Sequence, residues 1–142
     1  MNTIQELLNN KGSEIFSVQI NAPVIEALHL LAEKRIGALI VMDGEMLAGI
    51  LSERDYARKV VLEGKTSSNT KVREIMTSHV VCARPDQKIE ECLAIMSEKR
   101  VRHLPILDAK QLVGMVSIGD LVKAIIAEQK FQIEQMEHYI SG

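Results

Sequence analysis

A tandem repeat constrains this chain more than any other feature of its sequence. Residues 101–120 align without a gap on residues 36–55, so that Asp120 matches Asp55 at an offset of 65 (120 − 55). Two units of roughly 60 residues each bury little surface alone, and we therefore expect the halves to pack on each other. Other identical pairs at this offset include Glu26/Glu91, Leu28/Leu93, Glu33/Glu98, Lys34/Lys99, Arg35/Arg100, Leu39/Leu104, Asp43/Asp108, Leu47/Leu112, Gly49/Gly114 and Ser52/Ser117.

The overall composition is that of a globular protein without a polyanion-binding surface. The 142 residues are 46% hydrophobic and 25% charged, with a net charge of −2, so no basic patch points to nucleic acid or to a membrane surface. No apolar run approaches the roughly 20 residues that span a bilayer, and residues 1–11 lack the layout of a signal peptide. These observations predict a cytoplasmic protein.

Hydropathy patterns in the first half predict alternating helices and strands. Apolar residues at helical spacing predict a helix that opens at Asn21-Ala-Pro and continues to about Ala32. Two apolar runs of strand length flank Asp43-Gly-Glu, which is typical of a hairpin turn. The predicted order is a helix over 3–11, a strand over 15–20, the helix after 21–23, strands over 38–42 and 47–51, and a helix from 52 to about 62.

The second half repeats this order after a polar connection. Residues 63–70 contain one glycine, two serines and one asparagine, and we expect them to form a linker. A helix over 71–76, a strand near 80–83, a helix around Cys92, and strands over 103–107 and 112–117 follow. We therefore divide the chain into a first repeat with its lead-in helix (1–62), the linker (63–70), a second repeat (71–126) and a C-terminal helical tail (127–142).

Each half ends its predicted hairpin in the same motif, Gly-x-x-Ser-x-x-Asp. A β-α-β-β-α unit in duplicate with this ending resembles a tandem pair of cystathionine-β-synthase (CBS) domains, which is called a Bateman module. Residues 100–105 (Arg-Val-Arg-His-Leu-Pro) and 117–122 (Ser-Ile-Gly-Asp-Leu-Val) are especially similar to small bacterial stand-alone members, and the resemblance covers residues 3–126. It implies an α/β fold of two repeats packed with pseudo-twofold symmetry, here followed by a C-terminal helical extension.

The resemblance also implies a function. Bateman modules bind adenosine-containing ligands in clefts between the two repeats, namely AMP, ADP, ATP and in some members NAD(H) or S-adenosylmethionine. They act as regulatory sensors and not as enzymes. We therefore expect an energy-sensing module that binds an adenine nucleotide, with AMP or NAD favoured, and signals its occupancy to an unknown regulated protein. The alternative is a dimeric interaction scaffold that binds no ligand.

The Ser-x-x-Asp motifs place polar side chains where a strand meets a helix. A helix N-terminus offers free N–H groups and a positive dipole to a phosphate. The hydroxyls of Ser52 and Ser117 could donate to a phosphate oxygen, and the carboxylates of Asp55 and Asp120 could each accept both hydroxyls of a ribose. Spacing alone favours a simpler interpretation, the capping box. In the CBS family the matching residues touch the ligand, and the two roles can coexist.

Basic residues near these motifs are the next candidates. Arg54 and Arg58 stand one helical turn apart and could face an anion, although a solvated basic face explains them equally well. Arg102 and His103 have no charged counterparts in the first half, so we expect one cleft to prefer the more phosphorylated ligand. The alternative for His103 is a strand histidine that is satisfied by a backbone carbonyl.

The remaining candidates are apolar or carry sulfur. Ile15 and Val80 begin predicted strands and could line adenine pockets, as the family's equivalents do, but core packing explains both equally well. Cys82 and Cys92 form no Cys-x-x-Cys pair and have no His at ligand spacing, so core thiols are favoured over a redox or metal sensor. The sequence contains no recognisable catalytic or metal-binding motif, and we expect neither an enzyme nor a metal site.

The C-terminal segment carries an apolar seam. Gln129 occupies one seam position, and the others are Val122, Ile126, Ile133, Met136 and Ile140, which follow a heptad-like a/d spacing. A helix with such a seam must bury it, and the matching helix of a second subunit is the simplest place. The sequence therefore predicts a homodimer, with packing of the tail back on the module as the competing interpretation.

Overall fold

The computed structural model describes residues 2–141, and the chain divides into two compact units. We call residues Ile15–Val80 the first unit. The second unit consists of the residues up to Glu14 together with those from Val81 onward. The division separates the two repeats, as the duplication predicts, but it places the N-terminal helix with the second repeat.

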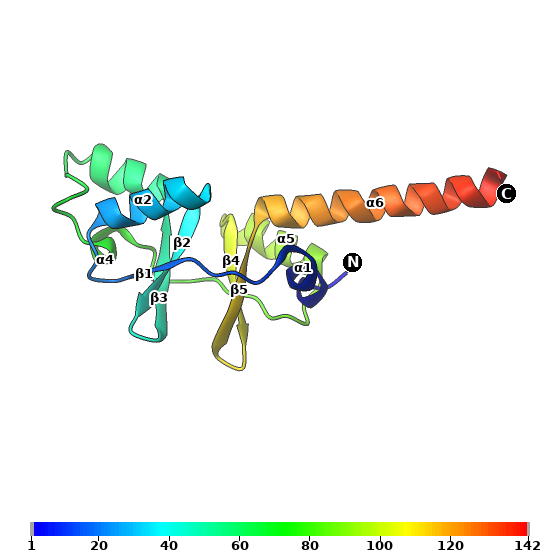
Figure 1. Cartoon of the computed structure of the whole chain (residues 1–142), viewed down its shortest axis with the longest axis horizontal. Coiled ribbons are helices and arrows are strands. Elements are labelled where there is room, and N and C mark those ends of the chain that lie inside the picture. Colours follow the sequence, from blue (N-terminus) through cyan, green and yellow to red (C-terminus); the bar gives the residue numbers. More distant parts are fainter. Residues whose placement is uncertain (1, 142) are drawn as a thin grey trace. The chain divides into compact units, whose positions relative to one another are not determined.

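The first unit is built on a three-stranded sheet (Figure 1). β2 pairs antiparallel with β3 as a hairpin, and β1 runs parallel to β2. The buried face of α2, which includes Val24, Ala27 and Leu31, belongs to one aliphatic core with the inward side chains of these strands. The elements in chain order are β1 (Ser17–Gln19), α2 (Val24–Lys34), β2 (Ala38–Asp43), β3 (Met46–Ser52), α3 (Glu53–Tyr56), the π-helix η1 (Ala57–Val61) and α4 (Val72–Ile75).

The second unit repeats this plan around the β4–β5 hairpin. Its core is again aliphatic, with Cys92 and Met96 of α5 packed among the strand residues Leu104 and Ile106. Its last helix, α6, runs far beyond the rest of the unit, as the orange-to-red ribbon in Figure 1 shows. The elements are α1 (Ile4–Lys11), α5 (Ile89–Lys99), β4 (His103–Asp108), β5 (Gln111–Ser117) and α6 (Ile118–Ser141).

Local irregularities are duplicated along with the regular elements. The hairpin register shifts between Val41 and Met42 in the first unit and between Ile106 and Leu107 in the second, at the same offset. Helices α2 and α5 both end at an arginine in the left-handed conformation, each with a φ of 55°. The two repeats therefore share backbone geometry, which confirms the α/β duplication predicted from the sequence.

Helices α1 and α4 are exchanged relative to the order of the sequence repeats. In the second unit, the amide of Ile4 donates to the carbonyl of Gln87 at 3.0 Å. In the first unit, the amide of Val72 donates to the carbonyl of Ala22, the residue equivalent to Gln87, at 2.9 Å. Helix α1 thus occupies in the second unit the place that α4 occupies in the first. The boundaries 1–62 and 71–126 follow the sequence repeat, whereas the compact units follow this exchange.

A glycine in each hairpin permits the close approach of these helical segments. A Cβ on Gly49 would lie 2.6 Å from the carbonyl oxygen of Thr77, which follows α4, and a Cβ on Gly114 would lie 2.9 Å from the side chain of Leu8 in α1. At Gly49 the neighbouring atom is backbone and leaves no room for a side chain, whereas at Gly114 a side chain would require Leu8 to move.

The strand expected near residues 80–83 does not form, and that prediction is wrong. Within the described residues this segment makes one isolated parallel bridge, between Ala83 and Ile106. In the first unit the flanking hydrogen bonds of β1 come from the amides of Ile20 and Ile40. Their equivalents at the 65-residue offset are Pro85 and Pro105, which have no N–H to donate. Two prolines therefore shorten the third strand of the second unit to a single bridge.

Two helices also differ from the expected ones. The helix predicted from residue 52 to about 62 consists of α3 followed by the π-helix η1, in which the amide of Leu62 donates to the carbonyl of Ala57 at 3.1 Å. The predicted tail, residues 127–142, is continuous with the second repeat, because α6 runs without a break from Ile118 to Ser141. Among the described residues, no helix is long and apolar enough to cross a membrane.

Candidate functional site

The Ser-x-x-Asp motif of the first repeat lies where β3 meets α3 and forms a capping box. The amide of Asp55 donates to Ser52 Oγ at 3.2 Å, and the amide of Ser52 donates to Asp55 Oδ2 at 2.9 Å. The Ser52 hydroxyl also donates to Asp55 Oδ2, at 3.0 Å. The capping interpretation of this motif is therefore confirmed, and the carboxylate is held in one orientation with its side chain 15% exposed.

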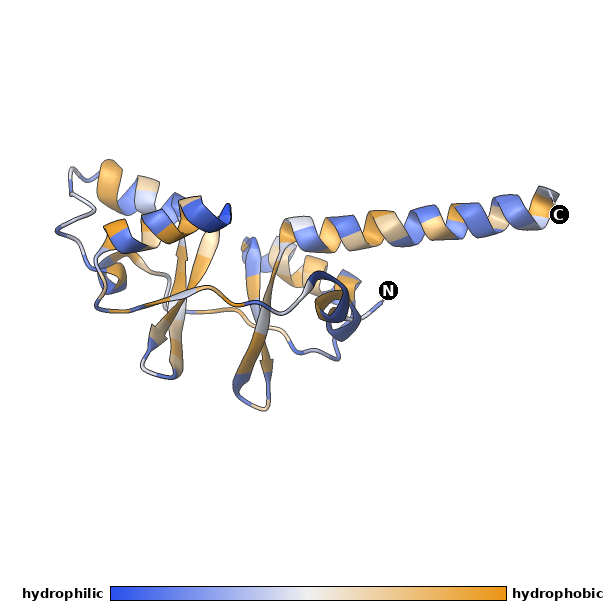
Figure 2. Ribbon diagram, viewed as in Figure 1, coloured by the Kyte–Doolittle hydropathy of each residue, from blue (hydrophilic) through white to orange (hydrophobic). Residues whose placement is uncertain are grey.

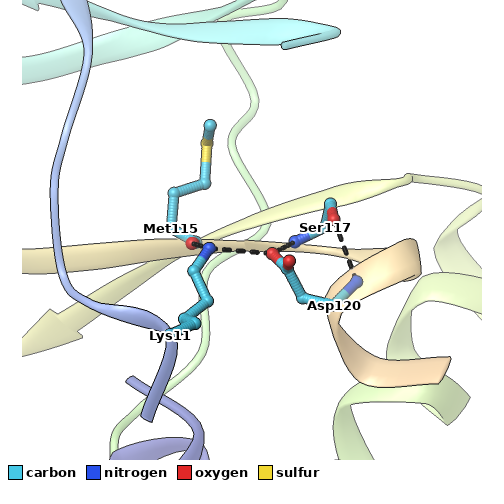
Figure 3. Close-up of polar contacts among 4 residues, drawn as sticks. All are labelled: Lys11, Met115, Ser117 and Asp120. Atoms are coloured by element: carbon cyan, nitrogen blue, oxygen red, sulfur yellow. Dashed lines mark hydrogen bonds and ion pairs between the residues drawn. The ribbon is translucent and has the colours of Figure 1, made fainter. Parts of the chain in front are cut away.

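The second repeat has the same box where β5 meets α6, with one addition. The amide of Asp120 donates to Ser117 Oγ at 3.1 Å, and the amide of Ser117 donates to Asp120 Oδ2 at 2.8 Å. Figure 3 shows a third partner, Lys11 of α1, whose Nζ donates to the same Oδ2 at 2.8 Å and to the carbonyl of Met115 at 3.0 Å. The carboxylate that the family resemblance assigns to ribose binding thus already holds a lysine from the far end of the chain.

Sequence reasoning missed Lys11 as a member of this site. It is 109 residues from Asp120, and nothing in its local pattern distinguishes it from other helix-terminal lysines. The contact depends on the exchange of α1 and α4, which places the last turn of α1 beside β5. An alignment of residues 3–8 with residues 71–76 could have indicated the helix exchange. The two segments share a hydrophobic spacing, and each has a glutamate, Glu6 or Glu74, that caps the start of its helix.

In the first repeat a different lysine lies near the aspartate, at a longer distance from its carboxylate. Lys59 of η1 follows Asp55 of α3 by four residues, and its Nζ lies 3.7 Å from Asp55 Oδ1. The same Nζ donates to the carbonyl of Ile75 in α4 at 3.1 Å. Both repeats therefore place a lysine between the carboxylate and a neighbouring backbone carbonyl, but it hydrogen-bonds the carboxylate only in the second.

The environment of Asp120 stabilises its ionised form. Burial is the largest single influence and raises the pKa of the carboxyl group, but the hydrogen bond and the charge of Lys11, together with the bonds from Ser117, outweigh it. The pKa of Asp120 therefore lies below its ordinary value. Asp120 is therefore held as a carboxylate that is paired with the Lys11 ammonium.

His103 lies beside the second motif, while Arg102 faces solvent. The β4–β5 register pairs His103 directly with Ser117, and opposite residues of an antiparallel pair share one face of the sheet. The carbonyl of Arg102 accepts the amide of Ile118 at 2.9 Å, and its side chain is exposed. The first repeat pairs Ala38 with Ser52 in the same register. The two junctions therefore differ in chemistry, as the sequence predicts.

The other predicted site residues all belong to the first unit. Arg54 on α3 and Arg58 on η1 are both exposed, with the π-helix beginning between them. Ile15 and Val80 are half-buried at the two ends of this unit. The role of these four residues in ligand binding stays a prediction.

Cys92 is a buried core thiol, and Cys82 is half-buried. Burial raises the pKa of Cys92 to about 11, with the charge of Glu91 adding to the shift and that of Arg84 opposing it. Burial also raises the pKa of Cys82. Protonated thiols are poor nucleophiles and poor metal ligands. Among residues 2–141, no group of three His, Cys, Asp or Glu side chains is placed to hold a metal ion.

Comparison with known proteins identifies the family. The CBS domain model matches residues 10–62 and 72–127. The chain belongs to the CBS domain family. The mitochondrial CBS domain-containing protein CBSX3 of Arabidopsis thaliana is 33% identical over 149 residues, which covers 99% of this chain and 72% of that protein. Stand-alone CBS-domain proteins of this kind are typically non-catalytic regulatory modules.

Two solved structures resemble the fold. A protein with CBS domains from Burkholderia ambifaria has a TM-score of 0.87 and 52% identity, over 89% of this chain and 96% of that one. A CBS domain pair solved in complex with 5′-methylthioadenosine and S-adenosyl-L-methionine has a TM-score of 0.78 at 23% identity, over 89% of this chain and 97% of that one. The second likeness is one of fold alone.

The ion pair between Lys11 and Asp120 makes stability depend on pH. Because the folded state lowers the pKa of Asp120, its ionised carboxylate stabilises the fold fully above the pKa of the unfolded chain, about 4. That contribution is lost as the pH falls through the lower, folded pKa. We expect Lys11→Met to lower the midpoint of thermal unfolding at pH 7, and we expect this difference from wild type to shrink below about pH 4.

Circular dichroism melts between pH 3 and pH 7 measure this difference. Lys123→Met is the matched control, because Lys123 is an exposed lysine of α6, and it should show no pH-dependent difference. A Lys11→Met effect of equal size at pH 3 and pH 7 would contradict the assignment.

Proposed function

We propose that this CBS-domain chain is a regulatory module that binds an adenosine-containing nucleotide at its two Ser-x-x-Asp junctions and signals the occupancy to a partner protein. AMP and NAD are the favoured ligands, with ATP and ADP as further candidates. The observation that carries the proposal is the duplicated placement of Asp55 and Asp120, each fixed by a backbone amide at 2.9 or 2.8 Å between a strand and a helix.

The chemistry of these carboxylates suits a ribose. A carboxylate has two oxygens and about four acceptor positions, and the capping bonds of Asp55 and Asp120 all fall on Oδ2. Hydrogen bonds that fix the side chain in advance lower the entropy lost on binding. A vicinal diol, with two donors at fixed spacing, is a matching partner for such a group. Recognition through the ribose is compatible with every nucleotide named above.

The differences between the junctions support unequal sites. His103 shares a sheet face with Ser117, whereas Ala38 stands at the equivalent position beside Ser52. A ligand with more phosphate groups gains from a nearby imidazole that can donate a hydrogen bond or carry a charge. We therefore assign the more phosphorylated ligand to the second repeat.

Known ligands of the fold are consistent with this proposal. 5′-Methylthioadenosine and S-adenosyl-L-methionine, the ligands of the structural neighbour, have adenosine in common and carry no phosphate. In the proposed mechanism, the nucleotide favours one of two conformations of the chain and shifts the equilibrium by its difference in affinity for them. The signal to the partner is that shift, and no chemical step is required of the module.

Conservative changes at the two aspartates test the proposal. Asp55→Asn and Asp120→Asn keep an acceptor for the capping amide but remove the charge and the second acceptor oxygen. We expect each change to weaken AMP binding at one site by about 1.5–3 kcal/mol, the value of a hydrogen bond to a charged group. Isothermal titration calorimetry of wild type, both single variants and the double variant measures the effect.

The chain supplies a matched pair of controls. Asp43→Asn and Asp108→Asn make the same chemical change at equivalent, exposed positions at the ends of the hairpin strands β2 and β4. They should leave AMP affinity unchanged. An intact double variant, Asp55→Asn with Asp120→Asn, that binds AMP as wild type does would refute ribose recognition by these residues.

The capping boxes also favour a second candidate, the dimeric scaffold. Both serine–aspartate pairs satisfy each other's backbone amides, so their presence is explained without any ligand. A scaffold of this kind gives no heat and no thermal stabilisation with adenosine nucleotides. The calorimetric titration of wild type therefore separates the two candidates.

The proposal includes a homodimer formed through the tail of α6. The buried residues of α6 are Leu121 and Ala124, both in its first two turns, and beyond them the helix alternates between hydrophobic and hydrophilic residues (Figure 2). The apolar seam residues are all exposed rather than packed back on their own unit: Val122 42%, Ile126 52%, Ile133 55%, Met136 63% and Ile140 79%. An exposed heptad seam on a protruding helix is typical of a two-stranded coiled coil.

Charge placed in the seam tests the dimer. We expect wild type to be dimeric and the double variant Ile133→Glu with Met136→Glu to be monomeric, because paired helices would bury like charges against each other. Light scattering coupled to size-exclusion chromatography measures the mass. Gln135→Glu adds a charge outside the seam and should stay dimeric. A monomeric wild type, or a dimer that survives both seam charges, would exclude this interface.

A further inference from the structure

We infer that Lys11 is a latch on the ligand site of the second repeat, and that a ligand which takes the Asp120 carboxylate releases the end of α1. The latch consists of the two hydrogen bonds from Lys11 Nζ, to Asp120 Oδ2 at 2.8 Å and to the carbonyl of Met115 at 3.0 Å (Figure 3). This inference rests on the proposed function and adds to it a means of regulation.

Competition follows from the geometry of the carboxylate. Each oxygen of a carboxylate has about two acceptor positions. Asp120 Oδ2 already accepts the amide of Ser117 and the ammonium of Lys11, both at 2.8 Å. A diol that binds both oxygens of Asp120 needs a position on Oδ2. The amide of Ser117 is fixed in the capping box, so the side chain that can leave is Lys11.

The first repeat lacks an equivalent competitor. Asp55 Oδ2 accepts two donors from Ser52, one of which is a hydroxyl that can rotate away at little cost. Lys59 lies 3.7 Å from the other oxygen, beyond hydrogen-bond distance, and is retained by the carbonyl of Ile75. Ligand binding at Asp55 therefore displaces no charged partner, and the latch is specific to the second repeat.

The position of Lys11 in the chain gives its release a mechanical consequence. It is the last residue of α1, and Gly12 ends the helix with a φ of 98°. The chain enters the first unit at Ile15, three residues after Gly12. Helix α1 stays attached through Ile4, Leu7 and Leu8, which are buried in the core of the second unit. Loss of the latch therefore frees the last turn of α1, where the chain passes from one unit to the other.

A single-site background isolates the effect on affinity. In the chain with Asp55→Asn, the Asp120 site remains to bind AMP. We expect Lys11→Met in this background to bind AMP about tenfold more tightly, because the ligand no longer displaces a charged donor that is partly exposed to solvent. Lys11→Arg keeps a cationic donor and should bind as its parent does. Lys59→Met in an Asp120→Asn background is the matched control and should change affinity by less than twofold.

Hydrogen exchange provides a second readout. We expect saturating AMP to speed exchange of the amides in the last turn of α1 in the chain with Lys11, and to leave them unchanged in Lys11→Met. A purely structural ion pair would make Lys11→Met less stable without raising its affinity for AMP. The thermal midpoints and circular dichroism spectra of all variants establish that they are folded at the temperature of titration.

The outcomes separate this inference from the proposed function. If the Asp55→Asn chain binds AMP and Lys11→Met leaves the affinity unchanged or weakens it, the latch is wrong and the nucleotide site stands. A weakened affinity would mean that Lys11 contacts the nucleotide directly. If neither wild type nor any variant binds AMP, NAD, ATP or ADP, the proposed function fails and the latch fails with it.

Discussion

The packing of α1 into the second unit and of α4 into the first is the interaction on which the rest of this structure depends. Each helix supplies apolar side chains to the core of its unit, and each approaches a hairpin where Gly49 or Gly114 leaves room for it. Without the exchanged helix, neither unit completes its core, since about 60 residues alone bury too little apolar surface. The exchange also determines which side chains reach the Ser-x-x-Asp junctions.

In the proposed function, one motif at these junctions serves both stability and recognition. The aspartate stabilises a helix start through the serine amide, and this same bond fixes the carboxylate in place. Duplication copied the capping box faithfully, so the two boxes agree in their partners to within 0.1 Å in each backbone bond. The two repeats differ in the residues around the box. His103 pairs with Ser117 where Ala38 pairs with Ser52, and the nearby lysine is Lys11 of α1 in the second repeat but Lys59 of η1 in the first. The proposed sensor would gain two unequal sites in this way, without any change to the motif.

The sequence predicted most features that depend on local pattern, although the π-helix η1 was not among them. The hairpins, the amphipathic helices and the two capping boxes follow from spacing within about ten residues, and the repeat follows from matches at one constant offset; the structure confirms them. It did not predict features that depend on the pairing of distant segments. The third strand of the second unit fails because Pro85 and Pro105 lack the amides used by Ile20 and Ile40, which is visible only once the register is known. Lys11 was missed because its contact requires the helix exchange. The residues expected at the adenine, Ile15 and Val80, stay predictions.

If the module carries an adenosine nucleotide, denaturing the purified protein will release it. Mass spectrometry of the released small molecules is the most direct test. Calorimetric titration of the stripped protein with the released compound completes the measurement. We expect one or two adenosine nucleotides for each chain, and we expect them to bind again to the stripped protein. Release of no such compound, together with no heat from AMP, ATP, NAD or S-adenosylmethionine, would contradict the claim and leave the dimeric scaffold as the function.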